Sequence, residues 1–150
     1  MIGTQRILVA LDGSKRGPHV LDVATALAKK LDAKVVLFRA VGLPTELPPE
    51  LWKHPEDSLI GMLKDAAQQY LSTLADGLPS AMRGGVEVVV GTPWQAICAQ
   101  ATKDDVDLIV IGSHGYHGLD RLLGTTASKV SNHADRSVLV VRARPASTRD

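Results

Sequence analysis

The chain has few cysteine and aromatic residues and almost no net charge, and each of these features excludes a class of function. It contains one cysteine, Cys98, two tryptophans, two tyrosines and one phenylalanine among 150 residues. A single cysteine excludes an intramolecular disulfide and a cysteine-based metal site. The 17 basic and 16 acidic residues leave a formal net charge of +1, and no basic patch is interleaved with aromatic residues. Neither nucleic acid nor a charged membrane surface is therefore indicated as a partner.

Long hydrophobic runs are also missing. No apolar stretch approaches the roughly 20 residues that span a bilayer, and the start of the chain is strand-like and unlike a signal peptide. We therefore expect a cytoplasmic protein without a membrane partner. The length predicts one domain over residues 1–150, with a small polar tail at 145–150 that we expect to fray.

Short apolar runs alternate with segments of helical periodicity along the whole chain. The runs, which we interpret as strands, cover 7–11, 34–40, 86–90, 107–111 and 138–141. Helical spacing of apolar residues occurs in 20–31, 60–74, 94–101 and 127–133. This alternation predicts an α/β fold, with an open parallel sheet of five strands and helices on both of its faces. Residues 42–55 contain four prolines and Trp52, and we interpret them as a long loop suited to act as a semi-rigid lid.

Turn and cap residues mark the helix starts. Ser14 can cap the first helix, and Pro18 suits its first turn. Thr92 and Pro93 make the same combination before the third helix. Cys98 lies on an apolar helical face beside Ile97, so we expect it in the core and unreactive.

A glycine-bearing segment follows the fourth predicted strand. Gly112 and Gly115 come directly after that strand, and Gly124-Thr125-Thr126 opens the last helix. Glycines let backbone amides approach a phosphate, hydroxyls add donors, and a helix N-terminus supplies unpaired N–H groups. The pattern predicts an anion site, and specifically a nucleotide site. The alternatives are plain turn glycines and a Thr125 that serves only as a helix cap.

The residues after the first strand suggest a second part of this site. Asp12 begins an Asp-Gly turn. It either caps the turn, or accepts a hydrogen bond from a ribose hydroxyl or holds hydrated Mg²⁺ near phosphates. In the glycine segment, protonated His114 or His117 would attract phosphate, and Arg121 could reach one. Solvated loop histidines and a surface pair between Arg121 and Asp120 are the alternatives.

These motifs together resemble the universal stress protein family. The resemblance rests on residues 6–14, Gly91-Thr92-Pro93, residues 107–115 and 137–142, and on the two glycines followed by Gly124-Thr125. In the family's usual ATP-binding signature, nine residues separate the second glycine from the third. In this chain eight residues separate Gly115 from Gly124. The resemblance implies the strand order 3-2-1-4-5, in which Asp12 and Gly112 meet where the strand order reverses.

The resemblance also implies a ligand and its contacts. The ligand would be ATP, or else ADP or AMP, with Mg²⁺ accompanying the nucleotide. Ala40 would take the position after the second strand where the family contacts adenine through backbone groups. The implied nucleotide-binding residues are Ala10, Leu11, Asp12, Ala40, Ile111, Gly112, His114, Gly115, Gly124, Thr125 and Thr126, with Asp12 as the possible metal contact.

The last predicted strand would be an edge of the sheet in this order. An edge as apolar as Val138–Val141 exposes unpaired backbone and favours association. The family commonly dimerises through this strand, so the resemblance implies a homodimer through residues 138–142. The alternative is an edge protected by covering helices and by charges such as Arg142.

Three classes of function compete on such a fold. The first is an ATP-binding protein of the bacterial-type stress response, acting as a nucleotide-dependent signalling or protective dimer. The second is a slow Mg²⁺-dependent ATPase or nucleotide-dependent transferase, although the chain lacks a Gly-x-x-x-x-Gly-Lys-Ser/Thr loop and a clear general base. The third is a receiver or flavodoxin-like carrier. It is disfavoured because Gly91 stands near where a receiver carries its aspartate, and the glycines follow the fourth strand, not the first.

Overall fold

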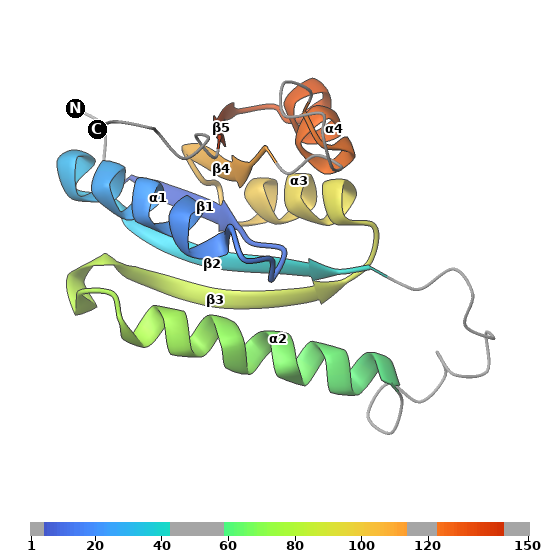
Figure 1. Ribbon diagram of the computed structural model, residues 1–150. Coiled ribbons are helices and arrows are strands. Elements are labelled where there is room, and N and C mark those ends of the chain that lie inside the picture. The colour runs from blue at the N-terminus through green and yellow to red at the C-terminus, as the bar shows by residue number, and fades with distance from the viewer. Residues whose placement is uncertain (1–4, 43–58, 114–122, 143–150) are drawn as a thin grey trace, which may run out of the picture.

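The computed structural model describes residues 5–42, 59–113 and 123–142. Five strands and four α-helices alternate within these ranges (Figure 1). The strands are β1 (Arg6–Ala10), β2 (Lys34–Val41), β3 (Arg83–Val90), β4 (Leu108–Gly112) and β5 (Ser137–Val141). The helices are α1 (Gly17–Leu31), α2 (Leu59–Asp76), α3 (Pro93–Lys103) and α4 (Thr125–His133), and a short 3-10 helix, η2 (Ser80–Met82), precedes β3. None of the helices in these ranges is both long and apolar enough to cross a membrane.

The strands form one parallel sheet in the order β3-β2-β1-β4-β5. Leu8 of the central strand β1 aligns with Val36 of β2 on one side and with Ile109 of β4 on the other. The predicted fold class and strand order are confirmed. All pairings are parallel, and strands that are buried on both faces read as continuous apolar runs, which is why the sequence pattern identifies them.

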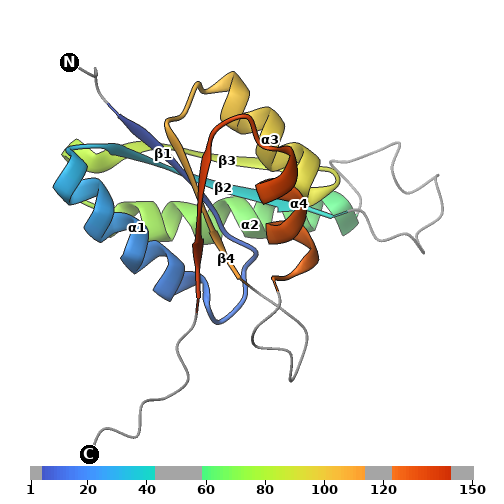
Figure 2. The same ribbon diagram turned by 90° about the horizontal axis from the view of Figure 1, so that it is seen from above.

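The two faces of the sheet carry separate cores, each covered by two helices. Helices α1 and α2 cover one face and α3 and α4 the other (Figures 1 and 2). The first core joins side chains such as Val9 and Leu37 to Ala24 and Leu71. The second joins Leu8, Phe38 and Ile109 to Ile97, Ala101, Ala127 and Val130. Successive residues of a strand point to opposite faces, so each central strand supplies both cores.

Several predicted boundaries are displaced. The strand β2 continues to Val41, so Ala40 lies inside it, and the last helix begins at Thr125, within the predicted opening Gly124-Thr125-Thr126. Thr92 and Pro93 begin α3 as predicted, although the Thr92 side chain makes no capping hydrogen bond. Residues 43–55 of the predicted loop and the tail at 145–150 lie outside the described residues.

The predicted cap of the first helix is wrong. Arg16, not Ser14, is the N-cap residue of α1. The Ser14 hydroxyl accepts a hydrogen bond from the backbone N–H of Arg16 at 3.3 Å, and the Ser14 carbonyl accepts one from Gly17 at 3.1 Å. Ser14 therefore closes the turn that precedes the helix.

Candidate functional site

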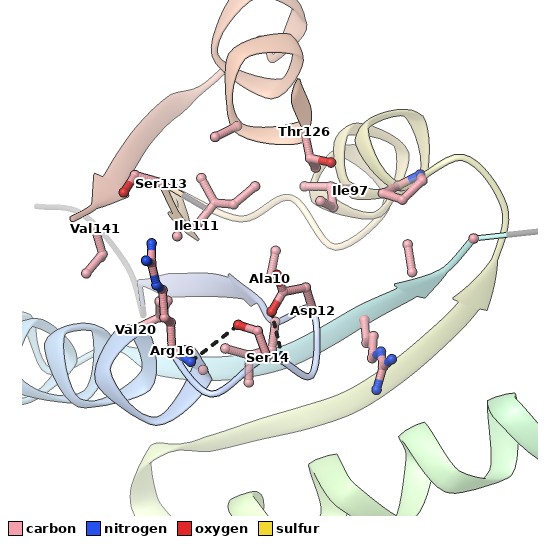
Figure 3. A pocket seen from close by; sticks show the side chains of 18 of the residues that line it. Ala10, Asp12, Ser14, Arg16, Val20, Ile97, Ile111, Ser113, Thr126 and Val141 are labelled. Carbon is pink, nitrogen blue, oxygen red and sulfur yellow. Dashed lines mark hydrogen bonds between the residues drawn. The ribbon is translucent and has the colours of Figure 1, made fainter. Parts of the chain in front are cut away.

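A cavity of about 670 Å³ opens at the carboxyl edge of the sheet (Figure 3). It lies beyond the ends of β1 and β4, where the strand order reverses, which is the usual ligand site of an open α/β sheet. Its volume lies within the range of ligand pockets, about 300–1,000 Å³. The cavity is therefore large enough for a nucleotide-sized ligand.

The structure brings most of the predicted site residues together in the cavity lining. They come from four segments that are distant in sequence, and they are Ala10, Leu11, Asp12, Ala40, Ile111, Gly112, Thr125 and Thr126. Gly124 is buried as the N-cap residue of α4 and is not part of the lining. His114 and Gly115 lie outside the described residues, as do His117 and Arg121.

The turn after β1 is held by its own side chains. An Asp12 carboxylate oxygen accepts a hydrogen bond from the Ser14 N–H at 2.9 Å, which is the Asx-type turn that Asp-Gly sequences favour. Gly13 has a φ of +78°, a left-handed conformation that side chains rarely adopt. This hydrogen bond and the left-handed glycine define the conformation of the turn at the cavity wall.

A basic side chain from β2 reaches the same turn. A Cβ atom placed on Gly13 would lie 2.6 Å from Nη1 of Arg39 and 2.9 Å from its Cζ. The guanidinium therefore occupies the space that a side chain at position 13 would need. The left-handed backbone conformation is the main reason for glycine at position 13, and the Arg39 contact adds a smaller cost because the far end of that flexible side chain can shift.

The start of α4 faces the cavity with backbone and hydroxyl donors. Gly124, with φ −61° and ψ 161°, is the cap residue, and no side chain caps the helix. The first N–H groups of a helix lack intrahelical partners, and the dipole adds partial positive charge there. Thr125 is exposed and Thr126 half-buried, and both line the cavity. Their hydroxyls and the helix N-terminus suit an anionic group.

Gly112 connects this region to the sheet. A Cβ atom on Gly112 would approach Cγ2 of Val20 to 3.1 Å, so close packing against α1 favours glycine here. Its φ is not left-handed. Ser113 follows, and its N–H donates to the Val141 carbonyl at 2.9 Å, which extends the β4–β5 pairing to the cavity.

Sequence reasoning missed several residues of the lining. Arg16, His19 and Arg39 are basic, Ser113 is polar, and Leu63 and Val141 are apolar, and all of them line the cavity. His19 Nε2 also lies 3.4 Å from the Arg142 carbonyl oxygen. One signal was available: Arg39 is a charged residue that interrupts the apolar run of the strand β2. The others come from helices or strand ends whose direction the sequence pattern does not fix.

The charges of the lining favour an anionic ligand. Among the described lining residues, the two guanidinium groups of Arg16 and Arg39 outnumber one carboxylate, Asp12. The described residues contain no group of three His, Cys, Asp or Glu side chains that could hold a metal ion. Mg²⁺ typically binds through one or two carboxylates plus substrate phosphates. Asp12 fits that role for a cation that arrives with a phosphorylated ligand.

Cys98 lies apart from this chemistry. Its side chain is partly buried on α3 and packs against the second core. Burial raises the pKa of the Cys98 thiol, and the nearby Asp135 carboxylate raises this pKa further. The thiolate, which is the reactive form, is therefore disfavoured at neutral pH.

Comparisons with known proteins identify relatives along almost the whole chain. The profile of the "Universal stress protein family" matches residues 3–142. Universal stress protein YxiE of Bacillus subtilis is 30% identical over 145 residues, which cover 91% of this chain and 98% of that protein. The solved structure of the universal stress protein UspA from Lactobacillus plantarum superposes with a TM-score of 0.72 at 27% identity, covering 95% of this chain and 100% of that one.

Two other similar structures were solved with a bound nucleotide. A universal stress protein in complex with cAMP has a TM-score of 0.68 at 23% identity, covering 95% of this chain and 100% of the other. The universal stress protein from Archaeoglobus fulgidus in complex with dAMP has a TM-score of 0.63 at 17% identity, covering 95% and 100% of the respective chains. At these identities the likeness concerns the fold.

Proposed function

The chain belongs to the universal stress protein family, and we propose that it binds an adenine nucleotide in the cavity at the carboxyl edge of its sheet. The observation that carries this proposal is the junction of three features in one cavity: the start of α4, the Asp12 turn and two guanidinium groups. Donors and cations on the walls match phosphate groups, and the apolar remainder of the lining matches a base. The cAMP and dAMP complexes of two proteins with this fold support the choice of adenine.

The positions of the lining residues suggest an orientation for the ligand. The phosphates would lie at Gly112, Thr125 and Thr126, which line the cavity and offer N–H and hydroxyl donors. By the family resemblance, Gly115 and Gly124 would contribute as well. Asp12 would accept from the ribose or contact Mg²⁺ held by the phosphates. The base would lie over Ala40 at the end of β2, where a small side chain leaves room. Within this class we propose ATP as the ligand, accompanied by Mg²⁺.

Calorimetric titration tests the ligand and its site. We expect the protein to bind ATP in the presence of Mg²⁺, with AMP and cAMP as comparison ligands. Gly115→Val should abolish this binding if the glycine segment holds the phosphates. Gly91→Ala is the matched control, because a Cβ atom at Gly91 meets no atom within 4 Å and Gly91 does not line the cavity. Equal affinity of wild type and Gly115→Val would contradict the proposed placement of the phosphates, and absence of any nucleotide binding would contradict the function.

We further propose that the protein acts as a nucleotide-dependent homodimer through β5. This strand is an edge of the sheet and pairs only with β4 among the described residues. Its outer backbone groups can pair with a second copy of the same strand. Light scattering should give the mass of two chains, and Val140→Pro, which introduces a residue without an N–H group, should reduce it to one. A wild-type mass of one chain would contradict this proposal.

A further inference from the structure

Arg16 occupies an unusual place in the site. It is the N-cap residue of α1 and lines the cavity. Its backbone is fixed, because its N–H donates to Ser14 Oγ at 3.3 Å and its carbonyl accepts from the Val20 N–H at 3.1 Å. Figure 3 shows its side chain extending away from the Asp12–Ser14 turn in the direction of Ser113 and Val141. The guanidinium thus points from the α1 side toward the place where the glycine segment begins.

The charge of Arg16 has no stabilising role in its own helix. Cations at a helix N-terminus are unfavourable because the dipole is positive there. The first turn of α1 nevertheless contains no acidic residue, and Lys15 precedes Arg16. Within residues 5–42, 59–113 and 123–142, the Arg16 side chain makes no ion pair or hydrogen bond. Residues that violate a local preference, such as a cation at a helix N-terminus, are expected most often at functional positions.

The opposite wall of the cavity supplies a different kind of contact. Thr126, at the start of α4, lies across the cavity from the Asp12–Ser14 turn in Figure 3. That wall offers neutral hydroxyl and N–H donors, whereas Arg16 offers a full charge in a planar fork that matches phosphate. If a ligand lies between the two walls, the part of the ligand that extends toward Ser113 would contact Arg16.

We infer that Arg16 is a specificity-determining residue that contacts the terminal phosphates of the bound nucleotide, so that the site favours ligands with more phosphate groups. This inference rests on the proposed function. It assigns to the α1 wall a role separate from that of the α4 wall: the donors of α4 hold the first phosphate of any nucleotide, and Arg16 distinguishes a triphosphate from a monophosphate.

The test is a set of calorimetric titrations of AMP, ADP and ATP at one ionic strength without Mg²⁺. Wild type should bind ATP more tightly than AMP. Arg16→Gln should weaken ATP binding about tenfold, as expected for one charge-assisted contact, and should change AMP binding by less than about twofold. Arg16→Lys should retain part of the preference, because the charge remains while the bidentate geometry is lost.

Lys15→Gln is the matched control, since Lys15 is also a cation at this helix end but does not line the cavity. It should leave all three affinities unchanged. Thermal melting should show that neither variant is less stable than wild type, because each removes a cation from a helix N-terminus.

Three results would overturn the inference. One is equal weakening of AMP and ATP binding by Arg16→Gln, and another is an equal effect of Lys15→Gln and Arg16→Gln on ATP. Binding of AMP and ATP by wild type with the same affinity is the third. In all three cases the proposed nucleotide function would survive, whereas failure of wild type to bind any nucleotide would remove both.

Discussion

The turn after β1 and the start of α4 face the same cavity but are built differently. In the first, Asp12 and Ser14 side chains accept the hydrogen bonds of the turn, and Arg39 covers Gly13. In the second, the cap residue is Gly124 and no side chain caps the helix. In the first wall one Asp12 carboxylate oxygen and the Ser14 hydroxyl serve the turn itself, and the second wall presents donors to the cavity.

The difference suggests that the β1 turn mainly maintains the shape of the cavity, whereas the start of α4 mainly supplies contacts for a ligand. A left-handed glycine and two local hydrogen bonds define the conformation of the β1 turn. In the proposed function, the α4 start would recognise an anion through N–H and hydroxyl groups that no cap occupies. Changes at Gly13 or Ser14 in the turn should therefore affect stability first, and changes to the donors of α4 should affect binding.

Gly13→Ala should give the largest effect on stability. A non-glycine residue at φ +78° is strained, and its Cβ atom would lie 2.6 Å from Arg39 Nη1. We expect the free energy of unfolding to fall by about 1–3 kcal/mol, measured by urea denaturation. Gly91→Ala, with open space around its Cβ, is the control. Equal stability of the two variants would contradict this description of the turn.

A double-mutant cycle with Arg39→Ala separates the two causes. In that background the close approach is removed, so Gly13→Ala should cost less than in wild type. The cost that remains, about 1–2 kcal/mol, would belong to the backbone conformation. An unchanged cost would show that Arg39 does not restrict position 13.

Thr126→Val should affect binding and leave stability nearly unchanged. Both side chains are β-branched and similar in shape, but valine lacks the hydroxyl donor at the start of α4. Nucleotide affinity should fall about tenfold, which corresponds to about 1.4 kcal/mol, in calorimetric titration. Thr73→Val on α2 is the control, because Thr73 donates to the Gln69 carbonyl and does not line the cavity. If Thr126→Val loses stability without losing affinity for the nucleotide, the binding role assigned to the start of α4 is wrong.

Ser14→Ala should give the smallest effect. It removes the acceptor of the Arg16 N–H, whose hydrogen bond is long at 3.3 Å. We expect a destabilisation of about 0.5–1 kcal/mol in urea denaturation, a typical net value for one hydrogen bond. A loss as large as that of Gly13→Ala would mean that the hydroxyl, and not the glycine, defines the turn.

The fold was largely predictable because its signals are local. Runs such as Ile7–Leu11 and the helical spacing in 60–74 identify the elements. Their order in the sheet was not derivable from these patterns, since parallel pairings join strands that are distant in sequence. The strand order came from the family resemblance, which depends on the combination of motifs.

The candidate site was predictable only along the segments that carry glycine or turn signals. Asp12, Gly112 and Thr126 follow such signals, and the structure places them in one cavity lining. Arg16 and Arg39 were not predicted as site residues, because the direction of a long side chain depends on the tertiary structure. Arg39 reaches Gly13 only because β2 lies beside β1.

The central position of β1 also affects how the cavity comes into being during synthesis. This strand leaves the ribosome about a hundred residues before β4, its partner on one side. Until β4 arrives, a nascent chain that has paired β1, β2 and β3 carries an open sheet edge along β1 and lacks the part of the cavity wall that comes from β4, α4 and β5. The proposed nucleotide would therefore bind only once the C-terminal part of the chain is present, so it would stabilise the finished protein and would not guide its early folding.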